Sequence, residues 1–259
     1  MICYWLNHRT NGTGRERKQI MTAKKVFAQP IIRSRLHEEI VTVIQKQIMN
    51  GTIPPGSKLP PEREMAQTFN VNRATLREAL RKLEHLDLLE IHHGDGLYVK
   101  NYMESGNFDL IKAALDMDES GAIISNILET RRYVVPQMAY MAAQRRTTAD
   151  LKELKQVISK AEMNMLERDI KVHQIIARAT HNLVCTISLN FFNQVFRDYG
   201  YLYFDDEINV EHSRVFHKEI YQAIKARQPE AARRIMRDVL IYAEEAVKAS
   251  LDNKRQKEQ

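Results

Sequence analysis

The chain has 259 residues, more than one compact hydrophobic core usually spans, so two domains are expected. Its composition, 44% hydrophobic and 28% charged, is that of a globular protein, and no apolar run approaches the roughly 18 residues that a membrane span needs. The two cysteines, Cys3 and Cys185, exclude a disulfide framework and favour a reducing compartment such as the cytoplasm.

The net charge of +6 lies entirely in the first two-fifths of the chain. Residues 1–102 hold 16 Lys and Arg against 10 Asp and Glu, whereas the remaining residues hold 23 of each. This asymmetry indicates a polyanionic partner for the first part alone, although a solvated basic surface would give the same excess.

The first 29 residues show no periodicity and predict a disordered tail, in which Met21 offers a second candidate start. Apolar residues at helical spacing then predict a helix over residues 34–49, which Gly51 and the following prolines end. Pro60-Pro61 before acidic residues predicts a second, short helix.

Asn72 is a suitable N-cap for a third helix, which we expect to run from Arg73 to about Leu86. Two β-prone stretches, residues 88–92 and 97–100, flank glycine-rich residues 94–96 and predict a hairpin. The order of helix, helix, short turn, helix and hairpin is typical of a winged helix-turn-helix, here over residues 30–100.

Residues 101–106 are polar and predict a linker, after which the periodicity is helical almost throughout. The fold class is therefore mostly α: the winged helix-turn-helix is followed by an all-α bundle of six or seven helices over residues 107–251. Residues 252–259 are expected to form a disordered tail. The expected helices of the bundle are residues 107–115, 123–145, 148–165, 167–179, 187–199, 210–226 and 230–251.

The run GTIPPGSKLPPEREMA at residues 51–66 continues through VNRATLREAL at residues 71–80 and closes with HGDG at residues 93–96. Together, about 70 residues resemble the N-terminal domain of the GntR family of bacterial regulators. Asn72 stands where the family usually has Ser or Thr, and Asp87 where a glycine is common, but both suit a cap or a turn.

The resemblance implies a cytoplasmic homodimer that binds double-stranded DNA at a pseudo-palindromic operator, as a repressor or an activator. Arg73 and Arg77 lie four residues apart and share one face of the helix that would enter the major groove. An isolated arginine pair is more often a solvated face, but this one follows a matched turn and precedes a wing. By similarity, the expected DNA contacts are Arg63, Asn72, Arg73, Thr75, Arg77, His93 and Gly94.

The second half resembles the FadR-type subfamily, whose bundle binds an effector and dimerises. The residues that carry the resemblance are Glu129-Thr-Arg131, Asp169-x-x-x-His173, Ala179-Thr-His-Asn182 and His217-x-x-Ile-x-x-Ala-Ile224. Metal-binding members of the subfamily use an Asp and three His. By position, Asp169, His173 and His217 match three ligands.

The fourth ligand falls at Asp238 or one residue later, at Val239, where no ligand would be present. One expectation is therefore a divalent ion such as Zn, Ni or Mn. The alternative is that Asp169 and His173 form only a hydrogen bond and that Asp238 is solvated beside its arginine neighbours.

By similarity, Arg131 would bind the carboxylate of an effector through its bidentate fork, although an ion pair with a neighbouring helix is equally compatible. Residues 101–111 and 197–204 also resemble fatty-acid-responsive members, which bind long-chain acyl-CoA without a metal. Tyr199, Tyr201 and Tyr203 would then line the pocket, although such aromatic residues are more often packing.

Two other classes of protein compete with a regulator. A metal-dependent enzyme would use the Asp/His cluster to activate water, but the sequence has no nucleophile elbow, phosphate loop or dedicated general base. A nucleoid-type DNA binder would need no elaborate helical half. We therefore expect a DNA-binding regulator, not an enzyme, controlled by a carboxylate or an acyl-CoA, with no membrane partner.

Overall fold

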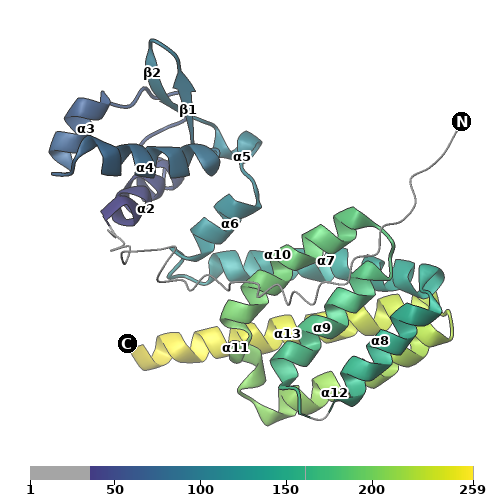
Figure 1. Cartoon of the computed structure of the whole chain (residues 1–259). Coiled ribbons are helices and arrows are strands. Elements are labelled where there is room, and N and C mark those ends of the chain that lie inside the picture. The colour runs from purple at the N-terminus through teal and green to yellow at the C-terminus, as the bar shows by residue number, and fades with distance from the viewer. Residues whose placement is uncertain (1–35, 161, 259) are drawn as a thin grey trace, which may run out of the picture.

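The computed structural model describes residues 36–160 and 162–258, so the tail expected over residues 1–29 lies outside the described residues. Within these ranges the chain forms a winged helix-turn-helix and a helical bundle (Figure 1). Each of the two has its own hydrophobic core. The predicted fold class is therefore confirmed. The described helices include none that is both long and apolar enough to span a bilayer.

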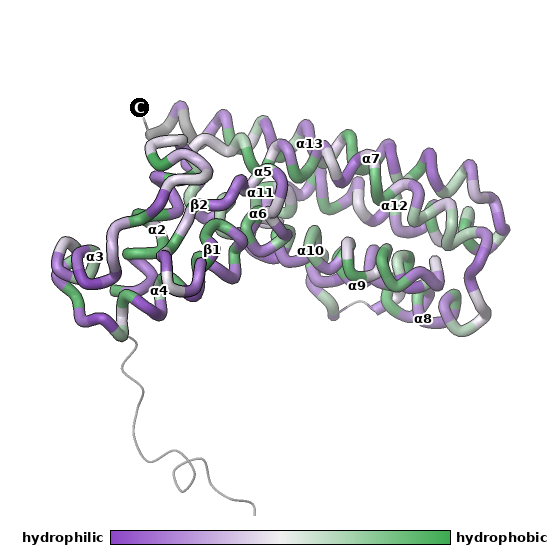
Figure 2. Tube along the Cα trace, turned by 90° about the horizontal axis from the view of Figure 1, so that it is seen from above, coloured by the Kyte–Doolittle hydropathy of each residue, from purple (hydrophilic) through white to green (hydrophobic). Residues whose placement is uncertain are grey.

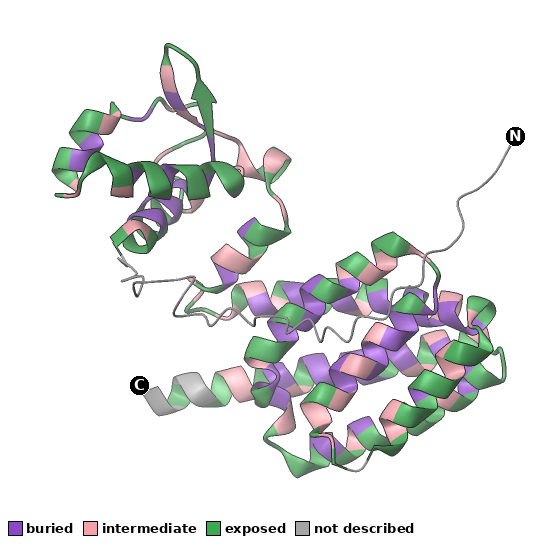
Figure 3. Cartoon of the chain, in the orientation of Figure 1, coloured by how far each residue is buried: buried purple, intermediate pink, exposed green. Residues whose placement is uncertain are grey.

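From Leu36 onward, the winged domain has three helices and a two-stranded antiparallel sheet in which Leu89 pairs with Val99 and His92 with Gly96. Its elements are α2 (Leu36–Met49), α3 (Glu62–Thr68), α4 (Arg73–His85), β1 (Leu89–His92) and β2 (Gly96–Val99). One face of α4 is buried against α2, and the opposite face is exposed (Figure 3).

Two turns of the winged domain place non-glycine residues in the left-handed region. Asn70, with φ of 52°, lies in the turn between α3 and α4, and Asp87, with φ of 58°, leads from α4 into β1. Asn and Asp adopt this conformation more readily than other non-glycine residues do. Asp87 Oδ1 also accepts a hydrogen bond of 2.8 Å from Lys100 Nζ, so the side chain anchors the turn that a glycine would otherwise make.

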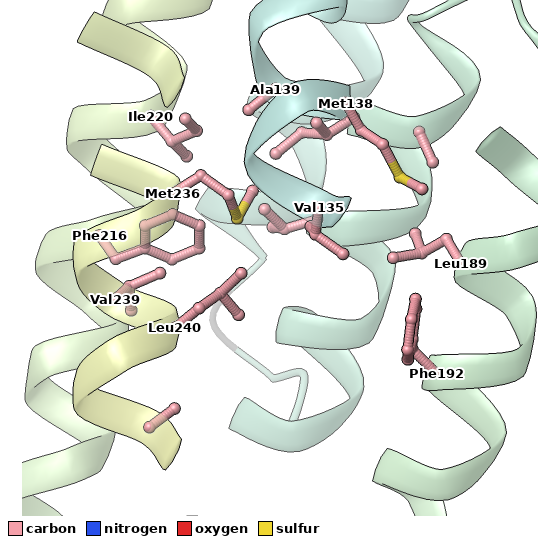
Figure 4. Packing of buried hydrophobic residues seen from close by; sticks show 14 of the residues in the cluster. Val135, Met138, Ala139, Leu189, Phe192, Phe216, Ile220, Met236, Val239 and Leu240 are labelled. Atoms are coloured by element: carbon pink, nitrogen blue, oxygen red, sulfur yellow. The ribbon is translucent and has the colours of Figure 1, made fainter. Parts of the chain in front are cut away.

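The bundle is organised around two long helices, α7 and α13, which pack along each other. The helices are α7 (Ala122–Arg145), α8 (Thr148–Ser159), α9 (Met165–Arg178), α10 (Leu183–Tyr199), α11 (Tyr201–Phe204), α12 (Glu207–Lys225) and α13 (Pro229–Glu258). Hydrophobic residues line the inner faces of these helices and hydrophilic residues the outer faces (Figure 2). Phe216 of α12 meets Val239 and Leu240 of α13 in the core (Figure 4).

Several stretches of the bundle differ from the predicted elements. The helices predicted to begin at residues 187 and 210 begin earlier, at Leu183 and Glu207, where Asn182 and Asp206 cap them. The predicted helix 148–165 ends at Ser159, because Asn164 caps α9 by accepting a hydrogen bond from the backbone N–H of Glu167. The expected break at residues 200–207 contains the short helix α11. The prediction of a disordered tail from residue 252 is wrong up to Glu258, because α13 continues through Asp252 and the following residues, which include no Gly or Pro.

The expected linker at residues 101–106 contains a short helix, α5 (Tyr102–Ser105), and is followed by α6 (Phe108–Leu115). Leu110 of α6 is buried in the core of the winged domain, whereas Leu115 is buried in the core of the bundle. Phe108 stacks on Phe191 of α10, with ring centroids 4.8 Å apart. α6 therefore bridges the two domains and packs on the winged domain as well as on the bundle.

Candidate functional site

The first turn of α4 presents the side chains predicted to read DNA. Asn72 caps the helix, since its side-chain oxygen accepts a hydrogen bond of 2.8 Å from the backbone N–H of Thr75. Arg73 and Arg77 are exposed, while Leu76 between them is fully buried. The cap fixes the start of the helix and leaves the amide N–H groups of Asn72 available to a nucleic acid.

One of these arginines forms an ion pair that no sequence pattern predicts. Arg77 Nε lies 2.8 Å from Glu62 Oε2, across the turn between α3 and α4. Both side chains are partly exposed to water, so the pair is weak. The pair occupies the Nε–H of Arg77, so this donor can bind a base edge only after Glu62 moves away. Arg63, the next residue on α3, is exposed.

The wing carries His93 and Gly94 at its exposed tip. Gly94 has φ of 82°, and a Cβ atom there would meet no protein atom within 4 Å, so the space at the tip is open to a ligand. Asp95 accepts hydrogen bonds from Lys58 Nζ and Tyr98 Oη, each 2.5 Å long. Together, these bonds tie the tip to the segment before α3 and lower the pKa of Asp95.

In the bundle, four buried polar side chains meet. Arg131 of α7, Asp169 and His173 of α9, and His217 of α12 are each less than 6% exposed. His217 Nε2 donates a hydrogen bond of 2.9 Å to Asp169 Oδ1, and Arg131 Nη2 lies 3.3 Å from His173 Nε2. We call these four residues the Arg131 cluster. All four are residues predicted from the sequence to bind a metal or an effector, and the structure brings them together.

Charge and burial set the protonation of the Arg131 cluster. Burial lowers the pKa of His173 to about 3, so its ring is neutral and its Nε2 accepts a hydrogen bond from the guanidinium of Arg131. Burial favours the neutral acid of Asp169, but the histidines and Arg131 outweigh it and lower its pKa. Asp169 and Arg131 therefore carry opposite charges within the cluster.

Three polar atoms in and beside the cluster have no hydrogen-bond partner among the described residues. They are Arg131 Nε, His173 Nδ1 and the hydroxyl oxygen of Tyr203, from α11. Tyr203 is 2% exposed, and burial raises its pKa to about 12, so it keeps its proton. Because His173 Nε2 accepts from Arg131, its Nδ1 carries the proton. All three atoms are therefore donors that lack an acceptor.

The predicted fourth metal ligand does not join the cluster. Asp238 is 58% exposed and pairs with Arg237 at 3.2 Å, because its side chain points away from the core. The next residue, Val239, is buried beside Phe216, which stacks on His173 with centroids 5.6 Å apart. Within the described part of the chain, no three His, Cys, Asp or Glu side chains are arranged to hold a metal ion.

The three tyrosines named for an acyl-CoA pocket occupy different surroundings. Tyr199 is half-buried near Asp116 and Asp118, whose charges contribute to raising its pKa after burial. Tyr201 is 42% exposed, whereas Tyr203 is buried beside the Arg131 cluster. The structure therefore places only Tyr203 with the other predicted effector residues.

Comparison with known proteins gives the same two domains. Residues 36–99 match the family of bacterial regulatory proteins called gntR, and residues 126–241 match the FCD domain. An uncharacterised HTH-type transcriptional regulator of Mycobacterium tuberculosis is 32% identical over 167 residues, which are 62% of this chain and 68% of the relative.

Two further relatives have named roles. The galactonate operon transcriptional repressor of Escherichia coli is 28% identical over 209 residues, covering 75% of this chain and 89% of the repressor. A fatty acid metabolism regulator protein of Shewanella is 28% identical over 191 residues, covering 71% of this chain and 78% of that protein. The chain therefore belongs to the GntR family, as a FadR-type transcriptional regulator with a DNA-binding winged domain and an effector-binding FCD domain, and it is not an enzyme.

Proposed function

We propose that the chain is a cytoplasmic homodimer whose affinity for a pseudo-palindromic operator is controlled by a small carboxylate bound at the Arg131 cluster. The observation that carries the proposal is the set of three buried donors without acceptors: Arg131 Nε, His173 Nδ1 and the Tyr203 hydroxyl. Buried donors without partners cost free energy, so a ligand that supplies acceptors gains from binding there.

A carboxylate is the ligand that these donors fit best. It has two oxygens and no donor of its own, and arginine binds it through two parallel hydrogen bonds. Such a ligand would satisfy the donors without introducing a new unpaired group. One relative is the repressor of a galactonate operon, and galactonate is a carboxylate, which supports the same class.

An acyl-CoA effector is the second candidate, because a relative is a fatty acid metabolism regulator protein. The separate surroundings of Tyr199, Tyr201 and Tyr203 argue against the pocket expected for it. The carboxylate is therefore the first class to test.

The dimer is proposed from the geometry of the winged domain. A single recognition helix reads only a few base pairs, and helix-turn-helix dimers bind two half-sites about one turn of DNA apart. An effector changes operator affinity only if it binds the two states of the dimer with different affinities.

The DNA-binding part is tested by selecting duplexes from a random library with the full chain. A two-fold symmetric motif is the expected result, and selection without any preferred sequence at physiological salt would contradict the proposal. Binding of the selected duplex is then measured with small carboxylates, among them galactonate, and with an acyl-CoA.

We expect a carboxylate to change duplex affinity by about 10-fold or more, the usual range of allosteric coupling. The change should be lost in Arg131→Met and kept in Arg132→Met, which removes the neighbouring guanidinium outside the cluster. A response to acyl-CoA alone would transfer the proposal to the second candidate.

A further inference from the structure

The donor set of the Arg131 cluster is incomplete for a metal ion. Asp169, His173 and His217 supply three ligand atoms, and a structural site for a first-row ion has four. The α12–α13 turn centres on Gln228, and Val239 follows it by as many residues as His217 precedes it. Position 239 therefore stands level with His217 and faces the core, but its side chain has no ligand atom.

The guanidinium of Arg131 occupies the place of a cation in this cluster. Its Nη2 lies 3.3 Å from His173 Nε2, whose lone pair a metal ion would need. The Cζ atom of Arg131 lies 4.7 Å from the centre of the Phe196 ring, so the aromatic face holds the guanidinium in position.

The position of the guanidinium also opposes a metal. An ion bound by His173 Nε2 would lie directly beside the guanidinium of Arg131, because Nη2 is 3.3 Å from that nitrogen. Both side chains are buried from water, where two neighbouring cations repel each other strongly.

We propose that Arg131 supplies the positive charge that a metal ion would supply in this cluster, so that the chain binds its effector without a metal. Binding of the effector at this cluster rests on the function proposed above. Absence of a metal from the cluster rests only on the geometry of its side chains, and it can be tested without DNA or effector.

The experiment measures metal uptake by the full chain and by two variants. Each protein is incubated with Zn²⁺ or Ni²⁺ and desalted, and then its metal content and its melting temperature with and without chelator are determined. Arg131→Met removes the guanidinium and leaves Asp169 with two histidines. Arg132→Met is the matched control, because that side chain contacts Glu244 outside the cluster.

We expect no stoichiometric ion in the natural chain or in Arg132→Met, and no effect of chelator on either melting temperature. Arg131→Met should take up an ion, because Asp169, His173 and His217 can then hold it with water as the fourth ligand, and it should melt at a higher temperature with the ion. Uptake of about one ion by the natural chain, lost in His217→Ala, would overturn the proposal.

Failure of Arg131→Met to take up an ion while it is folded, as judged by circular dichroism, would refute the role of the guanidinium as the replacement. If Arg131→Met does not fold, the metal content of the natural chain and of His217→Ala still decides the question. Absence of operator binding would contradict the proposed function and leave these results unaffected.

Discussion

Release of Arg77 from Glu62 should be measurable as a gain in DNA affinity. The two side chains form an exposed ion pair with 2.8 Å between Nε and Oε2, and this pair must break before the Nε–H of Arg77 can bind a base. Exposed pairs are worth roughly 0.2–1 kcal/mol, so Glu62→Gln should tighten binding of the selected duplex by about 1.4-fold to about 5-fold through this term.

Removal of any acidic side chain near DNA also reduces repulsion from the phosphates, so a charge-matched control is required. Glu64→Gln is suitable, because Glu64 is exposed on the same helix and has no ion pair with any described residue. Binding is measured by fluorescence anisotropy at one fixed salt concentration. The excess gain of Glu62→Gln over Glu64→Gln reports the freed Arg77.

The excess should disappear in an Arg77→Ala background, because the interaction that it measures is then absent. Equal affinities of Glu62→Gln and Glu64→Gln in the natural background would refute the argument. If Glu62→Gln binds the duplex more weakly than the natural chain, the ion pair positions Arg77 for DNA and does not compete with DNA.

Three further predictions concern DNA reading, pH and the core. Arg73→Ala should weaken duplex binding by about 1–3 kcal/mol, measured by anisotropy, whereas Arg214→Ala on the bundle surface should not change it. The folded pKa of His173, about 3, lies below its usual 6.5, so the unfolded chain takes up the proton first and stability falls as pH drops from 6.5 toward 3. Urea denaturation at about pH 5 should show a loss of about 2 kcal/mol relative to neutral pH, and that loss should be absent in His173→Gln. Leu83→Ala, at a fully buried position of α4, should cost about 2–5 kcal/mol in the same assay, and a cost below about 1 kcal/mol would contradict its place in the core.

The winged domain could be predicted closely because its signals are local. Each signal determines the structure of only a few neighbouring residues. Examples are the prolines before α3, the cap that Asn72 forms on α4, and Gly94, whose positive φ makes the turn of the wing. The Glu62–Arg77 pair joins two helices across a turn, and no pattern within either helix announces it.

The fourth ligand position shows why the candidate metal site could not be settled in the same way. Successive side chains on a helix point in directions about 100° apart. An uncertainty of one residue in the alignment therefore decides whether the fourth side chain faces solvent or the core. Asp238 faces solvent and Val239 faces the core. The match for Asp169, His173 and His217 depends on spacings that the subfamily resemblance supplied, and the structure places these three side chains together.

The position of α6 limits where this protein can be cut or recombined. Leu110 fills the winged domain and Leu115 fills the bundle, so a winged fragment that ends at residue 106 would lack part of its own core. A chimaera joined at that point to another regulator's bundle would receive a foreign α6, whose side chain at the position of Leu110 would not match the core of this winged domain. Fragments that retain α6, and junctions placed in the turn after Leu115, are the ones that preserve a complete DNA-binding unit.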